Sequence, residues 1–428
     1  MNKKIVGSAA AYALSNITVQ VFNFISTLLL MRLLSLEIFG SVGVLTEIFA
    51  LFMVIGESGV RNFIINKLRE KSEPFSNIKF SFQFQLYNAI TLAVIFYIIF
   101  IFVLKDVNYL DLLITLFFSA VYILTVPAQA TFLFKGKKNE MILKDMLTAG
   151  LRLLFILITF YLNLKVNIHE VMMLWLIPVA ISSIYLNRIW RTAEGSIGDL
   201  SSRVSSSTYI ENAVLLIPFL SISIVNGIYN RVGVFVLQYF GSVSEAGLYI
   251  GAAKFVLPCV FILFAFSNSL TQTFSSDKLP LFNWKFALLC ISPAFFIYIC
   301  LNFIVPIIFT NFFFGKYDGS ISILRILSLY VLIVFSYGLF SSYLIVNGHQ
   351  KKILKVNICS LIMIVFSSLY LVPRFSALGL AYAFISVEIC IALFYFITIA
   401  KMGLKPTLFF IFPSLYALVY CAISIYPS

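Results

Sequence analysis

Polar residues interrupt the first long apolar segment of this chain at helical spacing. Residues 9–31 are numerous enough to cross a bilayer core about 30 Å thick, yet Asn16, Gln20, Asn23 and Thr27 recur there at intervals of four, three and four. That spacing places the four side chains on one face of a helix. Because amides in lipid lack hydrogen-bond partners, we expect the stripe to face a neighbouring helix or a wet cavity.

Apolar segments of this length recur along the whole chain and predict an all-α polytopic membrane protein. The predicted spans are 9–31, 39–60, 82–104, 110–134, 141–164, 171–187, 211–240, 246–274, 284–310, 321–347, 353–373, 377–400 and 407–426. The composition agrees, because the 428 residues are 61% hydrophobic and only 11% charged. With the N-terminus inside, most of the 30 Lys and Arg fall in inner loops, as the positive-inside rule requires. The net charge of +13 therefore indicates no nucleic-acid partner.

Two matches within the chain predict an internal repeat. Residues 21–48 can be placed over 228–255 without a gap, and the later stretch 136–144 resembles 348–355. The first match aligns Asn23 with Asn230, Ser35 with Ser242, Gly40 with Gly247 and Glu47 with Lys254.

The repeat predicts a domain organisation of two parallel six-helix lobes. They would cover residues 1–190 and 211–400, joined by a cytoplasmic connector at 191–210 and followed by an additional membrane segment at 401–428. Binding sites in such proteins usually lie between the halves.

Five short stretches carry a family resemblance that extends over residues 5 to 400. They are LLSLEIFGSVGV (33–44), E-S-G (57–59), GSVSEAGLYIGAAK (241–254), NGHQKK (347–352) and VPRFSALGLAYA (372–383). With the amide-bearing first span, they resemble bacterial O-antigen and polysaccharide flippases of the multidrug/oligosaccharidyl-lipid/polysaccharide exporter superfamily. Such flippases often have twelve or fourteen spans, so a thirteenth span at 407–426 departs from the family.

The resemblance implies two lobes in a V around a central cavity, lined by spans 1, 2, 7 and 8. The implied substrate is an undecaprenyl-pyrophosphate-linked oligosaccharide, carried from the inner to the outer leaflet of a bacterial inner membrane, with a cytoplasmic N-terminus. The resemblance implies no cofactor. The implied partners are the membrane lipid, a polysaccharide polymerase and a chain-length regulator.

Charges inside the predicted spans are the candidates for binding the pyrophosphate. Arg231 lies about nine residues, or roughly 14 Å, from the end of span seven, where a lone charge should face water, a carboxylate or an anionic ligand. We expect Arg231, helped by Lys254, to hold the pyrophosphate. Glu47 and Lys254 are expected to face each other across the cavity, although a static salt bridge or snorkelling of Lys254 stays an alternative.

Arg152 and Glu388 reach the middle of spans five and twelve. A cavity role and a structural ion pair are both open for each. Glu388 and Glu47 are also candidates for coupling transport to a proton or sodium ion.

The remaining polar residues allow both a cavity role and a packing role. In span seven, Ser223, Asn226 and Asn230 form a second stripe that favours a cavity, with helix–helix hydrogen bonding as the alternative. Lys144 and Asp145 are expected to snorkel to the interface. Glu57 and Arg61 have the i,i+4 spacing of a helical ion pair.

Other functions are weighed against the sequence. An enzyme such as a polysaccharide polymerase is disfavoured, because the predicted outer loops are short and the chain has no D-x-D, G-x-S-x-G, H-E-x-x-H or G-x-x-x-x-G-K-[ST] motif. Only two histidines occur, both in loops, and the six cysteines lack paired spacing, so no metal centre is expected. An ion-coupled multidrug exporter of the same superfamily and a scaffold for a polysaccharide assembly complex stay as alternatives.

Overall fold

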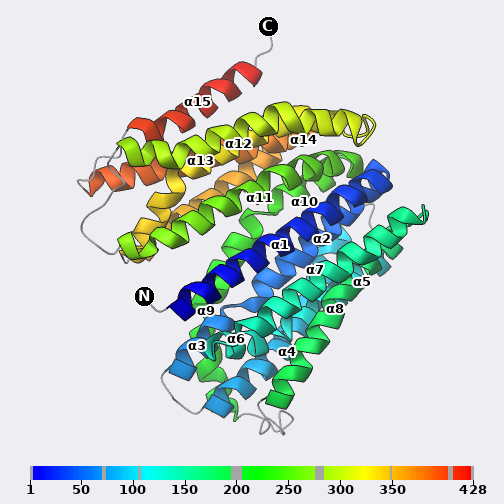
Figure 1. The fold of residues 1–428 in the computed structure, drawn as a ribbon, viewed down its shortest axis with the longest axis vertical. Coiled ribbons are helices and arrows are strands. Elements are labelled where there is room, and N and C mark those ends of the chain that lie inside the picture. The colour runs from blue at the N-terminus through cyan, green and yellow to red at the C-terminus, as the bar shows by residue number, and fades with distance from the viewer. Residues whose placement is uncertain are drawn as a thin grey trace. The chain divides into compact units, whose positions relative to one another are not determined.

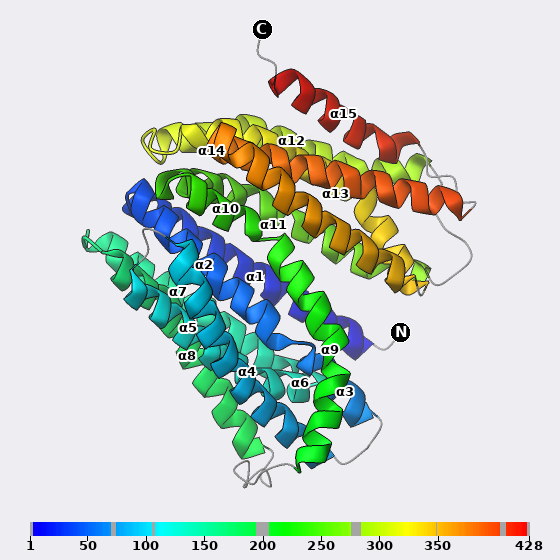
Figure 2. The same ribbon diagram turned by 180° about the vertical axis from the view of Figure 1, so that it is seen from behind.

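The computed structural model describes residues 3–69, 74–104, 108–193, 205–274, 284–347, 349–402 and 408–425. These residues form helices joined by short turns (Figures 1 and 2). The helices are α1 (Lys3–Leu33), α2 (Leu36–Glu57), α3 (Val60–Arg69), α4 (Pro74–Val103), α5 (Tyr109–Ile123), α6 (Val126–Phe134), α7 (Lys138–Tyr161), α8 (Ile168–Ala193), α9 (Ser206–Tyr229), α10 (Val232–Phe240), α11 (Val243–Phe274), α12 (Trp284–Asn311), α13 (Gly319–Val346), α14 (Gln350–Lys401) and α15 (Leu408–Ile425).

Ten helical segments among the described residues are long and apolar enough to cross a membrane, which confirms a polytopic membrane protein. The number differs from the thirteen predicted spans for three reasons. The last segment, Lys351–Lys401, contains two predicted spans, with non-helical backbone angles at Ser376 inside α14. The span predicted at 141–164 forms α7, which is not among the ten. The apolar part of α15, Phe410–Ile423, is shorter than the others.

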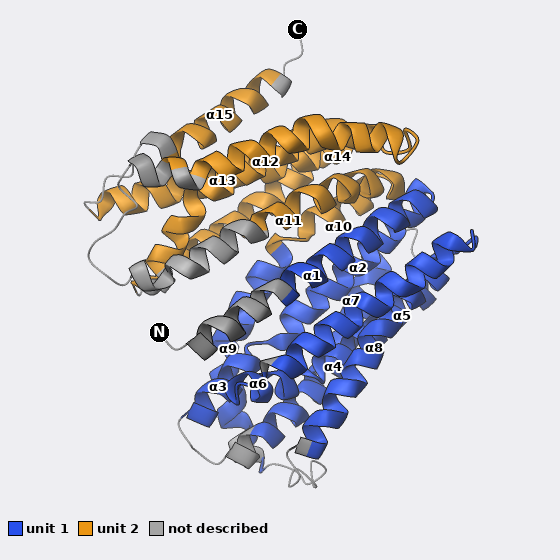
Figure 3. Cartoon of the chain, in the orientation of Figure 1, with its two compact units in different colours: residues 1–228 blue, residues 229–428 orange. Residues whose placement is uncertain are grey.

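The chain divides into two compact units, residues 1–228 and 229–428 (Figure 3). In the first unit α1 packs on α7 and α4 on α5, and in the second unit α10 packs on α14 and α12 on α13. The lobe boundaries predicted at 190 and 211 stay a prediction. The division places nearly all of α9 with the first unit.

The serines at matched positions of the predicted repeat make the same kind of hydrogen bond. The Ser35 hydroxyl accepts a hydrogen bond from the Ile38 N–H (3.3 Å) at the start of α2, and the Ser242 hydroxyl accepts one from the Glu245 N–H (3.2 Å) at the start of α11. Both serines thus cap a helix in the same way.

The second sequence match also corresponds to equivalent turns. The Lys137 N–H donates to the Phe132 carbonyl (2.9 Å) before α7, and the His349 N–H donates to the Leu344 carbonyl (2.9 Å) before α14. Each bond reaches back five residues, a pattern typical of helix C-termini. The matched stretches therefore share local hydrogen bonds, and the repeat of whole six-helix lobes stays a prediction.

Three predicted spans are broken helices. In the span predicted at 39–60, α2 ends and is followed by Ser58 and Gly59, whose φ angles are 45° and 73°. The Asn88 side chain of α4 donates to the Gly56 carbonyl there (2.9 Å) and satisfies a group that the break leaves open. The other breaks separate α5 from α6 and α9 from α10. The breaks fall at Ser58–Gly59, Leu124–Thr125 and Asn230–Arg231, inside spans that are apolar on average, so the overall apolarity of a span does not reveal them.

Candidate functional site

Arg152 of α7 is buried inside the first unit, with 8% of its surface exposed. Its Nη1 donates to the Asn23 side-chain oxygen on α1 (2.8 Å), and its Nε and Nη2 donate to the Trp175 carbonyl on α8 (3.3 and 3.2 Å). The guanidinium also lies 3.9 Å from the centre of the Trp175 ring. Cation–π contact and hydrogen bonds therefore fix the orientation of this side chain.

The partners of Arg152 are neutral, which leaves its charge uncompensated. None of the ion pairs found among the described residues includes Arg152. A guanidinium carries five N–H donors, and the described contacts use three of them. An oriented, buried cation with donors to spare is suited to bind an anion.

Arg152 lines a cavity of about 240 Å³ within the first unit. This volume is below the roughly 300–1,000 Å³ of pockets for drug-sized ligands, so it suits a small head group. The lining comes from α1, α2, α5, α7 and α8, and consists of Val19, Asn23, Phe49, Met53, Tyr122, Lys144, Asp145, Thr148, Ala149, Arg152 and Val179.

Lys144 is the second cation of this cavity, and the expectation that it snorkels is wrong. It is 4% exposed, its Nζ lies 2.9 Å from an Asp145 carboxylate oxygen, and it lies 5.0 Å from the centre of the Tyr122 ring. Burial against an aromatic ring on α5 keeps it from the surface. With Asp145 ionised, Lys144 and Arg152 still leave the cavity with one positive charge.

The amide stripe of α1 divides between two environments. Asn23 binds Arg152, and the Thr27 hydroxyl donates to the Asn23 carbonyl (2.9 Å). Asn16 and Gln20 are exposed. The prediction that the stripe faces a neighbouring helix is thus confirmed at Asn23, while the cavity role of the other two amides stays a prediction.

Glu388 is a buried charged residue of the second unit. It lies on α14, is 2% exposed, and accepts hydrogen bonds on both carboxylate oxygens. The Tyr229 hydroxyl donates to Oε1 (2.6 Å), and the Tyr337 hydroxyl on α13 donates to Oε2 (2.7 Å). The Tyr337 ring stacks on Tyr395, with centroids 5.3 Å apart. The two tyrosine hydroxyls thus hold both carboxyl oxygens in place, and none of the ion pairs found among the described residues includes Glu388.

The other predicted site residues lie in both units. Arg231 is half-buried at the break before α10, where Asn230 is exposed. Asn226 is half-buried on α9. Glu47 of α2, in the first unit, and Lys254 of α11, in the second, are also half-buried, and their pairing stays a prediction.

The ion pair predicted between Glu57 and Arg61 is confirmed. The Arg61 Nε lies 2.9 Å from a Glu57 carboxylate oxygen, and an Arg61 Nη donates to the Gln129 side chain on α6 (3.1 Å). The pair bridges the break between α2 and α3 instead of lying on one continuous helix.

No protein-family model and no curated protein matches this chain. Solved structures do match over nearly its whole length. The lipid II flippase MurJ in an inward closed conformation has a TM-score of 0.74 at 14% identity, with 98% of this chain and 94% of MurJ covered. The chain has the fold of a lipid flippase and of multidrug transporters. The inward-facing conformation of a multidrug resistance MATE family transporter of the MOP superfamily has a TM-score of 0.72 at 13% identity, covering 90% of this chain and 95% of that one.

A MATE crystal structure in the bent conformation is similar as well, with a TM-score of 0.59 at 14% identity over 92% of this chain and 96% of that chain. These likenesses establish the fold. The substrate has to be argued from the residues of the cavity.

Proposed function

We propose that this protein is a flippase for undecaprenyl-pyrophosphate-linked repeat units of O-antigen or another polysaccharide. The observation that carries the proposal is the cationic cavity of the first unit, with Arg152 oriented by Asn23 and Trp175 and with Lys144 buried nearby. A guanidinium and an ammonium bind phosphate oxygens through charge-assisted hydrogen bonds. The fold shared with MurJ supports a lipid-linked substrate.

In this proposal the three parts of the substrate meet different surroundings. The pyrophosphate occupies the cavity between Lys144 and Arg152, the polyprenyl chain stays in lipid, and the glycan meets the exposed amides Asn16 and Gln20. Arg231 and Lys254 of the second unit, the cations expected from the sequence to hold the pyrophosphate, stay candidates for binding the same substrate, as do the amides Asn226 and Asn230. The protein works by alternating access in a bacterial inner membrane with its N-terminus in the cytoplasm.

Glu388 supplies the ion coupling in this proposal. A carboxylate held by two tyrosine hydroxyls exchanges a proton or a sodium ion without losing its position. Glu47 is the second candidate for this role. The polymerase and chain-length regulator of the same polysaccharide are the proposed protein partners, and the protein performs no enzymatic step.

The experiment is complementation of a bacterium whose own O-antigen flippase is deleted. Restored surface polysaccharide, together with loss of the accumulated lipid-linked repeat units, is the expected result. Arg152→Gln expressed at the same level in the membrane should restore neither. Accumulation that persists when the cognate glycan pathway is supplied would contradict the proposal.

Multidrug export is the second candidate, and the buried carboxylate Glu388 favours it. Cationic drugs prefer acidic sites, and several structural neighbours are multidrug transporters. The cation-lined cavity argues against this candidate. In a strain lacking its own drug exporters, the flippase proposal predicts unchanged sensitivity to ethidium and norfloxacin, whereas increased resistance that requires Glu388 would support drug export.

A further inference from the structure

Asp145 is the acidic residue among the described residues that line the cavity of the first unit. Its carboxylate lies 2.9 Å from the Lys144 Nζ. Neighbouring residues of a helix point about 100° apart, so this contact forms only because one of the two side chains turns toward the other. A cavity suited to bind an anion therefore already contains one.

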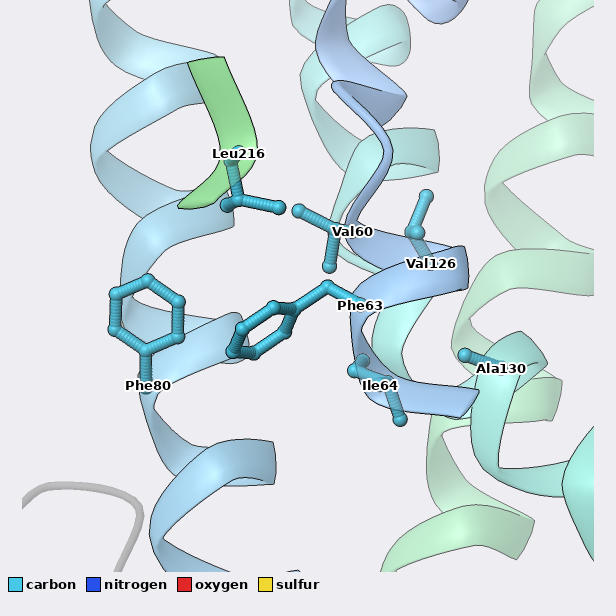
Figure 4. Close-up of a cluster of buried hydrophobic side chains, with 7 residues drawn as sticks. All are labelled: Val60, Phe63, Ile64, Phe80, Val126, Ala130 and Leu216. Carbon is cyan, nitrogen blue, oxygen red and sulfur yellow. The ribbon is translucent and has the colours of Figure 1, made fainter. Parts of the chain in front are cut away.

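The surroundings of Lys144 hold this side chain in place. It is 4% exposed and lies 5.0 Å from the centre of the Tyr122 ring. The Tyr122 carbonyl accepts a hydrogen bond from the Thr125 hydroxyl (2.7 Å) at the break between α5 and α6. Directly after the break, Val126 packs in an apolar cluster with Phe63 of α3 (Figure 4). This packing fixes the aromatic wall against which Lys144 lies.

The two members of the ion pair are buried to different extents. The side chain of Lys144 is 5% exposed, whereas that of Asp145 is 33% exposed. A buried charge that loses its partner is strongly destabilising, whereas a partly exposed carboxylate regains hydration when it is released. Asp145 can therefore leave the pair with little loss of stability, but Lys144 then needs another anion.

The other end of the cavity provides a second contact for such an anion. Lys144, Thr148 and Arg152 follow one another at intervals of four on α7, so they share one face of the helix. The two cations lie roughly 12 Å apart along the helix axis. Between them, the Thr148 hydroxyl donates to the Ser182 hydroxyl on α8 (2.6 Å), so its proton is engaged. An anion that enters meets Arg152 at one end and the Lys144–Asp145 pair at the other.

We propose that Asp145 is a built-in competitor for the head group of the lipid. In the empty cavity its carboxylate neutralises Lys144. One phosphate of the incoming pyrophosphate takes its place, while Asp145 turns toward water. When the lipid leaves, the carboxylate returns, so that release of the head group does not leave a buried ammonium alone. This role rests on the proposed function, because the displaced carboxylate belongs to the same cavity.

The test is equilibrium binding of undecaprenyl pyrophosphate to the purified natural protein, Asp145→Asn and Asp145→Glu. Asparagine removes the charge at nearly the same size, so the phosphate no longer displaces an anion and the Kd should fall about tenfold. Glutamate keeps a carboxylate within reach of Lys144 and should leave the Kd within about threefold of the natural value. A folding defect would weaken binding, so a gain of affinity is specific for lost competition. A Kd in Asp145→Asn equal to or above the natural value would overturn the proposal.

The same substitution in a Lys144→Met background separates competition for Lys144 from general repulsion. There Asp145 has no ammonium to occupy, so Asp145→Asn should change the Kd less than about threefold. An equal gain of affinity in both backgrounds would mean that Asp145 only repels the anion, and would contradict the proposal. If the natural protein binds undecaprenyl pyrophosphate no more tightly than undecaprenol, the proposed function is at fault instead.

A second measurement follows the Asp145 carboxylate in the natural protein and needs no variant. Carbodiimide-activated coupling of an amine labels accessible carboxylates, and mass spectrometry reads the extent of labelling at each one. Labelling of Asp145 should rise when undecaprenyl pyrophosphate binds and stay unchanged with undecaprenol. The internal control is Asp111, a buried carboxylate 3.0 Å from the His169 Nδ1, whose labelling should be the same with both lipids. Unchanged or reduced labelling of Asp145 with bound undecaprenyl pyrophosphate would overturn the displacement.

Discussion

Replacing Arg152 with glutamine separates a binding role from a structural role. The glutamine amide nitrogen stands where the Arg152 Nε lies, so it can keep one bond to the Trp175 carbonyl, but the substitution removes the charge, the contact with the Trp175 ring, the second bond to that carbonyl and the bond to Asn23. Hydrogen bonds from a charged donor contribute about 1.5–3 kcal/mol each. Burying a charge without a carboxylate partner costs several kcal/mol in lost hydration. These contributions oppose each other, so the thermal midpoint in detergent should change little.

The effect of Arg152→Gln on binding should be much larger. Losing a buried charge-assisted contact with pyrophosphate costs about 3 kcal/mol, and at 1.4 kcal/mol per factor of ten this weakens the Kd roughly 100-fold. The assay is equilibrium binding of undecaprenyl pyrophosphate to the purified protein. Arg152→Lys, which keeps the charge but not the planar fork, should fall between the two.

The opposite pattern would refute this reasoning. If Arg152→Gln bound undecaprenyl pyrophosphate as tightly as the natural protein while its unfolding midpoint fell sharply, Arg152 would be a packing residue. Undecaprenol, which carries no phosphate, is the matched ligand control, and its binding should be the same in all three proteins.

Three further predictions address the remaining groups. Lys144→Met should weaken undecaprenyl pyrophosphate binding roughly tenfold, since about 1.4 kcal/mol is expected from one exchangeable ammonium contact, and an unchanged Kd would remove Lys144 from the site. Glu388→Gln should abolish the acceleration of flipping by an ion gradient, and Tyr337→Phe should reduce it. The flipping rate is measured in proteoliposomes with and without the gradient, and full acceleration in Glu388→Gln would exclude this carboxylate from ion coupling. Ser35→Ala and Ser242→Ala should each cost about 1 kcal/mol as lost helix caps, seen as similar reductions of the unfolding midpoint, and a reduction in only one of them would argue against equivalent caps.

The helices of this protein were largely predictable because membrane spans follow from length and apolarity alone. The sequence match of Ser35 with Ser242 corresponds to two serine caps of the same kind. The Glu57–Arg61 pair followed from local spacing.

The breaks in three spans were not predictable from the apolar pattern. The break after α2 depends on Asn88, a residue of another helix, which satisfies the Gly56 carbonyl. Gly59 marks the position in the sequence, but a glycine alone does not distinguish a break from close packing. Pro127 at the start of α6 was the available signal for the second break.

The candidate site depended on contacts between distant residues. Asn23 and Arg152 are 129 positions apart, and only the packing of α1 on α7 brings them together. Lys144 was assigned to the interface because its position near a span end is compatible with snorkelling, whereas Tyr122 on α5 holds it inside. The tyrosines that bind Glu388 carried no signal of their own among the many aromatic residues of the chain.

The most direct test of the central claim is movement of the lipid itself. Purified protein is placed in liposomes with an undecaprenyl-pyrophosphate-linked glycan that carries a fluorophore, and dithionite bleaches the label in the outer leaflet. We predict that the protein exposes the protected label to bleaching at a rate that falls at least tenfold in Arg152→Gln. A rate no greater than that of empty liposomes, from protein shown to be folded and inserted, would contradict the account.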